Sequence, residues 1–451
     1  MPIPSPDTPP VGTSGGDLDL NLHGPAAAPV PRRAILAWCS FDWANSAFPT
    51  VVQTFLFSAY FTSHVAANPE AGTAAWGQAT GWAAIAIALL SPLLGAIADV
   101  GGRRKPWLAT LTVLTVAATA MLWFVRPDPA YGLFGLTAMA LGTVGFELGT
   151  VFYNAMLPAL VGPERVGRIS GWAWGLGYAG GLACLAVALL AFLLPAHPLF
   201  GLDKASAEQV RAAMLLTAIW FALFSLPLFL FVPDRPANGR GLGAAIREGL
   251  AQLMRTFRDL RRHANIARFL LAKMIYIDGL NTLFAFGGIY AAGSFGMSLE
   301  QVLIFGIVLN VTAGLGAAGF AWVDDWIGAK PTILIALAAT TLLGIAILLV
   351  DDVVWFWILA IAIGTFLGPT QAASRSMMAR LAPPKLATEF FGLYALAGKA
   401  TAFFGPWAVA AATTAFDSQR AGMATIPPFL MLGFLLLLLV KEPVRKLAPQ
   451  G

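Results

Sequence analysis

Apolar runs long enough to cross a lipid bilayer recur along almost the whole chain. A helix needs about 20 apolar residues to cross a hydrocarbon layer of about 30 Å. The bilayer requires each span to satisfy its backbone hydrogen bonds, so that only helices or a closed β-barrel can cross. A barrel strand would alternate apolar and polar residues, whereas the run from Phe434 to Val440 is apolar throughout. The sequence therefore predicts an all-α membrane protein.

The composition agrees with this class, because 58% of the 451 residues are apolar and only 11% are charged. A soluble domain carries about 25% charged residues. We predict twelve transmembrane helices, at residues 34–61, 76–98, 107–125, 131–157, 169–194, 212–232, 267–292, 300–323, 331–350, 354–379, 388–413 and 422–440.

Basic residues are distributed unevenly between the two sides of the predicted membrane. The loops after odd-numbered spans contain few of the 28 lysines and arginines, namely Arg126, Lys204, Arg211 and Arg420. The opposite side carries most of the others, including the arginine-rich segment 235–268. By the positive-inside rule, both chain termini are cytoplasmic. An even number of spans agrees with this orientation.

The non-spanning segments are a tail at each end and one long linker. Residues 1–33 lack the basic start and short apolar core of a signal peptide, and we predict a disordered cytoplasmic tail. In the linker, 233–265, apolar residues recur at helical spacing, at Ile246, Leu250, Leu253, Phe257 and Leu260. This amphipathic helix either lies on anionic headgroups or is a tether whose basic residues fix the topology. Its single aromatic residue argues against nucleic-acid binding.

Cysteine, histidine and motif usage argue against an enzyme. Cys39 and Cys184 both lie in predicted spans, so no disulfide framework is indicated. The 4 histidines fall in tails or loops, which disfavours haem or zinc sites inside the membrane. No HExxH or GxxxxGK[ST] segment is present, and a GxSxG match at 12–16 lies in the predicted tail. We expect no cofactor, no metal and no enzymatic activity.

Three short motifs occur twice, at positions about half the chain apart. Asp42-x-x-Asn45 recurs as Asp278-x-x-Asn281, and this spacing puts the carboxylate and the amide on one helical face. The other pairs are Gly95-x-x-x-Asp99-x-x-Gly102-Arg103-Arg104 with Ala321-x-x-x-Asp325-x-x-Gly328, and Pro158, Glu164 and Gly167 with Pro383, Glu389 and Gly392. We therefore predict two pseudo-symmetric six-helix bundles, 34–232 and 266–440, joined by linker 233–265 and followed by a cytoplasmic tail, 441–451.

Six ionisable side chains fall inside the predicted spans, namely Asp42, Glu147, Lys273, Asp278, Arg375 and Lys399. A charge at bilayer depth costs roughly 2.5 to 3.5 kcal/mol on insertion scales, so such residues usually pair or line a wet cavity. Three acids and three bases indicate a polar pathway. Lys273 lies near the cytoplasmic end of its span, and we expect it to snorkel.

Parallel halves with a site at their interface are typical of major facilitator transporters. Segment 95–105 resembles that superfamily's signature between its second and third helices, which implies a conformational latch of Gly95, Asp99, Gly102, Arg103 and Arg104, with Asp325 as the acid of the second copy. Val100 replaces an arginine that often follows the aspartate. Ala329 stands where the second copy should carry a base, so we expect that second latch to be weaker.

A narrower resemblance rests on WCSFDWANSAF from Trp38, FYNAMLP at 152–158, RISGWAWGLGYAGG at 168–181, DGLNTLF at 278–284 and QAASRS from Gln371. These segments resemble the vacuole-effluxer-like branch of the superfamily, related to the fungal autophagy-related amino-acid effluxer and its bacterial relatives. The resemblance implies a twelve-helix transporter whose first and seventh helices line a central cavity. Amino-acid export is known for the fungal members.

Several polar residues are expected in that cavity: Asp42, Asn45, Glu147, Asn154, Asp278, Asn281, Gln371, Ser374, Arg375 and Lys399. Gln371, Ser374 and Arg375 occupy positions i, i+3 and i+4, a donor-rich stripe suited to a carboxylate. The acids are suited to a cationic group or a proton. A cavity with both signs suits a zwitterion, whereas the alternative is that the charges form internal pairs and never contact solute.

We therefore expect a secondary active transporter that moves a small polar or zwitterionic, amino-acid-like solute by alternating access, in the direction of efflux. Proton coupling through Asp42, Asp278 or Glu147 is a hypothesis. A non-transporting scaffold or receptor and a lipid-handling protein are the alternatives on the same fold. We expect a monomer in a bacterial inner (plasma) membrane, in contact with lipids and without nucleic acid.

Overall fold

The computed structural model describes residues 30–442, so most of the predicted tails 1–33 and 441–451 lies outside the described residues. Every regular element within 30–442 is a helix, which confirms the all-α prediction. The helices are α1 (Arg32–Asn45), α2 (Phe57–Tyr60), α3 (Pro69–Gly101), α4 (Lys105–Met121), α5 (Gly132–Leu160), α6 (Val166–Ala188), α7 (Glu208–Phe231), α8 (Leu242–Arg258), α9 (Ala264–Phe295), α10 (Leu299–Ile327), α11 (Ala329–Leu348), α12 (Val353–Leu381), α13 (Ala387–Lys399), α14 (Phe404–Phe416), α15 (Gln419–Met423) and α16 (Ile426–Leu438).

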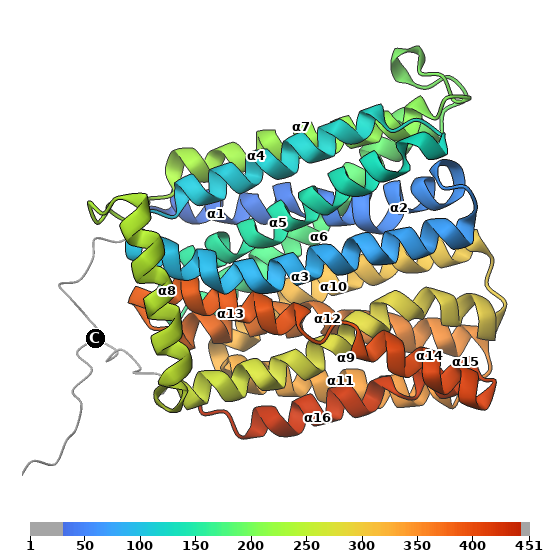
Figure 1. Cartoon of the computed structure of the whole chain (residues 1–451). Helices are drawn as coiled ribbons and strands as arrows, with labels where there is room; N and C mark the ends of the chain where they lie inside the picture. Colours follow the sequence, from blue (N-terminus) through green and yellow to red (C-terminus); the bar gives the residue numbers. More distant parts are fainter. Residues whose placement is uncertain (1–29, 443–451) are drawn as a thin grey trace, which may run out of the picture.

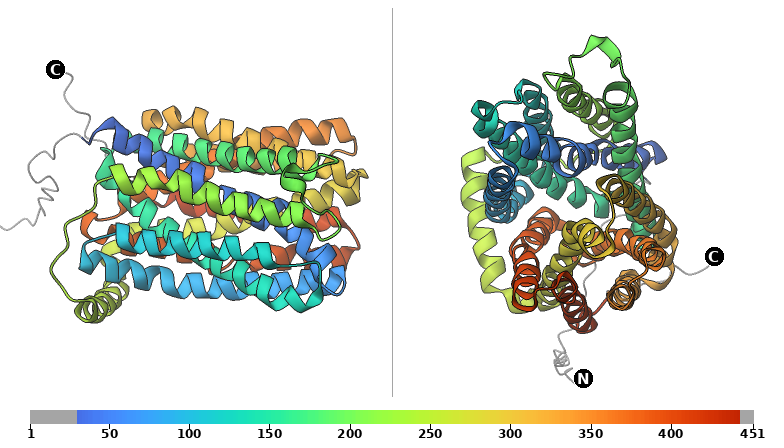
Figure 2. Two further views of the ribbon diagram at one scale, coloured as in Figure 1. Left: turned by 90° about the horizontal axis from the view of Figure 1, so that it is seen from above. Right: turned by 90° about the vertical axis from the view of Figure 1, so that its right-hand side faces the viewer.

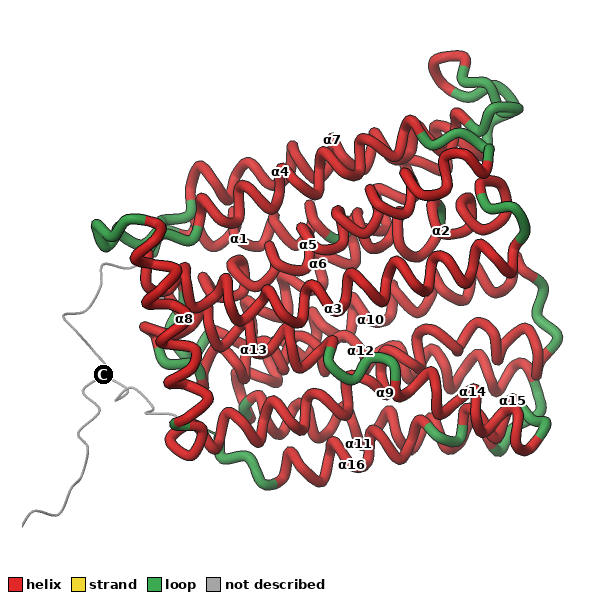
Figure 3. Tube along the Cα trace, in the orientation of Figure 1, coloured by secondary structure: helices red, strands yellow, loops and turns green. Residues whose placement is uncertain are grey.

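Within the described range, 10 helical segments are long and apolar enough to cross a membrane. The other two predicted spans, 34–61 and 388–413, are broken. In the first, α1 gives way to the π-helical segment Phe48–Phe55 and then to α2. In the second, residues 400–403 separate α13 from α14, and Figure 3 shows this interruption as a loop in the middle of the molecule. The structure is thus consistent with twelve spans.

A proline lies at each break. A proline has no N–H for the carbonyl four residues earlier, and its ring clashes with that carbonyl. Pro49 stands four residues after Asn45, where α1 ends, and Pro406 stands four residues after Ala402, inside the second break. Non-helical backbone at membrane depth is tolerated where protein buries it or where it lines a watery cavity. Residues 48–55 stay helical, in the π form, so only the second break interrupts the helix with non-helical residues.

The helices form two groups with α8 across one end (Figures 1 and 2). Helices α1–α7 lie on one side of the molecule and α9–α16 on the other. We call these groups the first and second bundles, and the surface along which α1, α3, α5 and α6 meet α10, α12 and α13 the bundle interface. The end of the molecule where α8 lies is called the α8 end.

Helix α8 lies within the predicted linker 233–265. Its inner side packs closely on α3, because Gly249 lies against the backbone of Ile97. Its outer side carries an exposed apolar stripe of Leu242, Ile246, Leu250, Met254 and Phe257. Leu253, which was expected in this stripe, is half-buried, and the side chain of Leu260 lies outside the description.

Small residues bring the two bundles into close contact at the α8 end. Gly95 of α3 lies against the carbonyl of Thr388, and Gly392 of α13 lies against the backbone of Ser91. The Ser91 hydroxyl donates to the carbonyl of Gly392 at 3.0 Å. On the other side of the interface, Gly171 of α6 lies against Ala321 of α10. Backbones approach this closely in membranes where side chains are small, and the α8 end is therefore closed.

Replacing Gly95 by valine tests this closed contact. The added side chain has no room beside Thr388, so we expect α3 and α13 to separate at the α8 end. Thr388→Cys is a suitable reporter, because Thr388 is fully buried. In bilayers, a water-soluble maleimide should label this cysteine several times faster in the Gly95→Val background.

The matched control is Gly81→Val in the same helix, where an added side chain meets open space. Labelling of Thr388→Cys should be unchanged in this background. Equal labelling rates in the two backgrounds would contradict a closed interface between α3 and α13.

Candidate functional site

Arg375 of α12 connects the second bundle to the first. Its Nη1 donates to Oδ2 of Asp42 in α1 at 2.8 Å. Its Nε donates to the hydroxyl of Ser170 in α6 at 2.9 Å, and its Nη2 donates to the Ser170 carbonyl at 2.7 Å. Asn154 of α5 adds a longer contact of 3.4 Å to Nη1. All of these partners belong to the first bundle, so the guanidinium is a polar anchor across the bundle interface.

Aromatic rings enclose the same guanidinium. Its central carbon lies 5.1 Å from the ring centroid of Trp38, 5.7 Å from that of Tyr153 and 5.4 Å from that of Trp174. Cation–π attraction strengthens when such a contact is desolvated, and Arg375 is only 2% exposed. The guanidinium nitrogens already donate to protein groups, and aromatic rings lie near the guanidinium. In this conformation Arg375 therefore has no pair of N–H groups free to bind a solute carboxylate.

The neighbouring residues of the predicted carboxylate stripe are also engaged. The Ser374 hydroxyl lies 2.6 Å from the Tyr276 hydroxyl. The Gln371 amide nitrogen donates to the Tyr178 hydroxyl at 3.4 Å. In this conformation, the stripe thus contacts protein groups of both bundles, Tyr276 of α9 and Tyr178 of α6.

A second ion pair crosses the bundle interface where it is more accessible. Lys399 Nζ, at the end of α13, lies 2.6 Å from Oε1 of Glu147 in α5. The two side chains are 27% and 25% exposed, against 3% and 12% for Arg375 and Asp42. Because ions near water are exchanged more cheaply than desolvated ones, this pair is the more open of the two to a charged solute.

The break in the eleventh span places Asp278 beside a helix start. The N–H of Gly405, in the first turn of α14, donates to Oδ2 of Asp278 at 3.2 Å. Anionic groups are favoured at helix N-termini and cations at C-termini, and Lys399 is the last residue of α13. Oδ1 of Asp278 is buried without a hydrogen-bond partner, and no ion pair joins Asp278 to a cation among the described residues. Asp278 is therefore the least compensated of the three acids.

Lys273 does not snorkel, so that prediction was wrong. The side chain is only 4% exposed. Its Nζ donates to the carbonyl of Tyr394 at 2.9 Å and lies 3.8 Å from the centroid of the Tyr394 ring. Gly398 leaves room for the ammonium group, because an added Cβ there would lie 3.0 Å from Nζ. A carbonyl and an aromatic face on α13 thus take the place of the interfacial water.

The remaining predicted cavity residues are placed less centrally. Asn45 is buried, and its Oδ1 accepts from the Ser46 hydroxyl at 3.3 Å. Asn281 is exposed on α9, one turn from Asp278, and no hydrogen bond joins it to the other predicted residues in the described part of the chain. The structure brings Asp42, Asn154 and Arg375 together, and Glu147 with Lys399.

Ser170, Trp38 and Tyr153 contact Arg375 but were not expected in the site. Trp38 stands four residues before Asp42, and Tyr153 is adjacent to Asn154. Helical spacing puts Trp38 on the face of Asp42, so this partner was visible in the sequence. No signal in the sequence distinguishes Ser170 from the other serines of the spans.

The latch residues form a connected group at the α8 end. Oδ1 of Asp99 accepts from the Thr388 hydroxyl at 2.7 Å, and Oδ2 accepts from the N–H of Glu389 at 2.8 Å. Arg104 approaches Asp99 at 3.3 Å and donates to the Thr388 hydroxyl at 2.8 Å. Gly102 ends α3 with a φ of 90°, a conformation that favours glycine. Asp99 and Arg104 therefore hold the end of α3 against the start of α13.

Arg103 is exposed and makes no ion pair among the described residues. The second copy of the latch obtains its bases from other helices. Arg168 of α6 lies 3.1 Å from Asp325, and Arg380 of α12 lies 3.5 Å from it. Arg168 crosses the bundle interface, so both copies of the motif contribute to closing the α8 end.

Comparison with known proteins assigns this architecture to a family. A model of the family described as "Vacuole effluxer Atg22 like" matches residues 79–446. The chain belongs to this family. It is 29% identical over 366 residues to YxiO, an uncharacterized MFS-type transporter of Bacillus subtilis (strain 168), in a match that covers 80% of this chain and 84% of that protein. It is 23% identical to autophagy-related protein 22 of Saccharomyces cerevisiae (strain S288c), covering 66% of this chain and 63% of the yeast protein.

Solved structures show the same fold at low identity. The proton:xylose symporter XylE, a major facilitator superfamily protein, superposes with a TM-score of 0.72 at 14% identity, covering 91% of this chain and 96% of that one. The human organic anion transporter MFSD10 (TETRAN) superposes with a TM-score of 0.69 at 16% identity, covering 91% and 100%. The major facilitator fold and the family resemblance are confirmed, and the Atg22-like chain is a membrane protein of transporter type.

Arg375→Gln tests the anchor. The change leaves Asp42 buried without its cation, and we expect the free energy of unfolding to fall by about 3 to 5 kcal/mol. The double variant Asp42→Asn/Arg375→Gln should recover part of this loss, because neither side chain is then charged. Denaturant unfolding in detergent micelles, followed by tryptophan fluorescence, measures the difference.

Arg165→Gln is the control, since it removes an exposed pair with Glu164. Such pairs contribute about 0 to 1 kcal/mol. If Arg375→Gln cost no more than this control, the anchor would not hold the bundles together.

Proposed function

We propose that this Atg22-like protein is a secondary active transporter that moves a small zwitterionic, amino-acid-like solute by alternating access. The observation that carries the proposal is the Glu147–Lys399 pair, which crosses the bundle interface at 2.6 Å and is about one quarter exposed. A zwitterion can replace both halves of such a pair, with its ammonium group on Glu147 and its carboxylate on Lys399. Each charged residue then keeps a partner while the bundles separate.

The same contacts support alternating access. The α8 end is held by the Asp99 and Asp325 latches and by Arg375, all of which are polar contacts between bundles. Opening this end requires these contacts to break together, because each of them spans the interface. We assign Arg375 to this anchor and not to solute binding in the closed conformation.

Proton coupling is assigned to Asp278. Asp42 is paired with Arg375 and Glu147 with Lys399, whereas Asp278 has only the Gly405 N–H and a buried oxygen without a partner. A buried carboxylate without a nearby cation is costly to keep charged, and binding a proton removes that cost. Among the predicted acids, Asp278 is therefore the one whose burial cost falls most when it binds a proton.

The orientation and location of the protein belong to the same proposal. The α8 end carries the basic loops, and the positive-inside rule supports a cytoplasmic location for this end and for both termini. We propose a monomer in a bacterial plasma membrane that exports its solute, contacts lipids along its spans, binds no nucleic acid and has no enzymatic activity.

A transport experiment tests the function directly. Purified protein in liposomes is given a panel of labelled amino acids and related metabolites, with and without an imposed pH gradient. We expect uptake of at least one zwitterionic solute, and stronger accumulation with the gradient. In Glu147→Gln, we expect weaker solute binding, because the ammonium group loses its anionic partner.

Asp278→Asn should abolish the effect of the pH gradient while exchange of solute across the membrane without a gradient continues. Asp203→Asn is the matched control, since Asp203 lies in an exposed loop, and it should behave as the unmodified protein. An undiminished gradient effect in Asp278→Asn would contradict the proton assignment. Absence of transport for every solute of the panel would favour a scaffold or lipid-handling role.

A further inference from the structure

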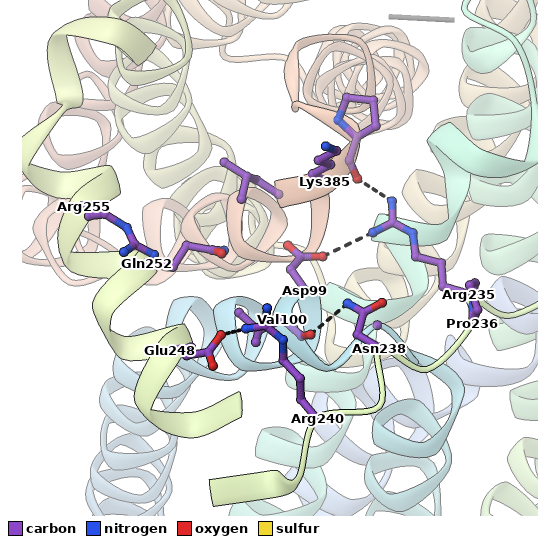
Figure 4. A pocket seen from close by; sticks show the side chains of 13 residues that line it. Asp99, Val100, Arg235, Pro236, Asn238, Arg240, Glu248, Gln252, Arg255 and Lys385 are labelled. Atoms are coloured by element: carbon purple, nitrogen blue, oxygen red, sulfur yellow. Dashed lines mark hydrogen bonds and ion pairs between the residues drawn. The ribbon is translucent and has the colours of Figure 1, made fainter. Parts of the chain in front are cut away.

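A cleft of about 750 Å³ opens at the α8 end between the linker and both bundles. Val100 and Gly102 contribute to it from the end of α3, Arg255 from α8, and Lys385 from the segment between α12 and α13. Figure 4 shows basic side chains entering the cleft from the linker, from α8 and from the second bundle. Its volume lies in the usual range for small-molecule sites, about 300 to 1,000 Å³.

The charges that line the cleft do not balance. Four basic residues, Arg235, Arg240, Arg255 and Lys385, face two acids, Asp99 and Glu248. Arg240 forms an ion pair with Glu248. Asp99 has no exposed side-chain surface and is already bound by Thr388, Glu389 and Arg104. The acids are therefore engaged, and the cleft keeps an excess of positive charge.

Arg255 and Lys385 supply this excess. Both are exposed, and neither makes a hydrogen bond or an ion pair in the described part of the chain. Arg235 lies between the bundles, where it donates to the carbonyl of Pro384 and approaches Asp99 at 3.6 Å. Arg255, whose charge also acts on the Glu389 carboxylate of α13, Lys385 and the nearby Arg235 guanidinium thus converge on one cleft from separate segments.

We propose that this cleft binds a monoester phosphate. Such a group carries about −1.5 to −2 charge at neutral pH, which suits the two exposed cations Arg255 and Lys385. Arginine favours phosphate because its planar fork bonds two oxygens at once. The same chemistry is present in a phosphatidic acid headgroup and in a soluble phosphate, and the experiment below separates these sources.

A phosphate bound in this cleft would stabilise the closed conformation. A bound phosphate connects Arg255 of the linker to Lys385 of the second bundle, next to Asp99 at the end of the first. Gln252, one turn before Arg255, already donates to Glu389 of α13 at 2.6 Å. Because opening the α8 end separates these walls, a ligand that needs all of them stabilises the closed state.

The test measures binding, so its result is independent of which solute is transported. Full-length protein in detergent is titrated with inorganic phosphate at constant ionic strength, with chloride as the exchanged anion, and the Tm is recorded. In a second arm, the protein is reconstituted in nanodiscs of phosphatidylcholine with either phosphatidic acid or phosphatidylglycerol. We expect a higher Tm with phosphate, with phosphatidic acid, or with both.

The double variant Arg255→Gln/Lys385→Gln should raise the dissociation constant by about tenfold or more for whichever probe raises the Tm. This change corresponds to about 1.4 kcal/mol. The control pair Arg258→Gln/Arg261→Gln removes the same charge from exposed positions outside the cleft and should leave it unchanged. Each single variant, Arg255→Gln and Lys385→Gln, gives a smaller loss and replaces the pair if the pair does not fold.

A response to inorganic phosphate alone identifies a soluble ligand, and a response to phosphatidic acid alone identifies a lipid headgroup. Either result supports the site. No response to either probe, an equal response to phosphatidylglycerol and phosphatidic acid without a phosphate effect, or equal losses in the cleft and control pairs would overturn it.

Discussion

The cost of a charge at bilayer depth is the constraint on which this structure depends. Four of the six intramembrane ionisable residues form two ion pairs, Asp42 with Arg375 and Glu147 with Lys399. Both pairs join the first bundle to the second. A buried charge that loses its partner costs about 3 to 5 kcal/mol, so the bundles can separate only if water, solute or a proton replaces what each charge loses. This requirement links bundle movement to ligand binding.

The two proline breaks set where these charges lie. Asp42 precedes the break at Pro49 in the first span, and Lys399 ends α13 before the break at Pro406. The start of α14 then presents an N–H to Asp278. Helix ends carry partial charges of either sign, and the broken eleventh span therefore offers favourable surroundings to a cation and to an anion within a few residues. Interrupted helices at the centre of a bundle are a recurrent feature of transporter binding sites.

The sequence was sufficient for the all-α fold and for the approximate positions of ten spans, because hydrophobicity and helical spacing are local properties. It did not determine the partners. Asp42 and Arg375 come from different halves of the chain, and their contact depends on how two bundles pack. The snorkelling prediction for Lys273 failed for the same reason, since Tyr394 and Gly398 on another helix provide its buried place. Proline alone does not reveal the breaks in the sequence, because Pro92, Pro158, Pro227 and Pro369 stand inside continuous helices.

Distances between the bundles at both ends, measured with spin labels in lipid bilayers, test the central claim most directly. One label pair replaces the exposed residues Arg165 and Arg268 at the α8 end, and the other replaces Glu70 and Glu300 at the opposite end. If intact interface pairs hold the α8 end closed, Arg375→Gln should lengthen the first distance and shorten the second. Unchanged distances at both ends in Arg375→Gln, with the protein folded, would contradict the account.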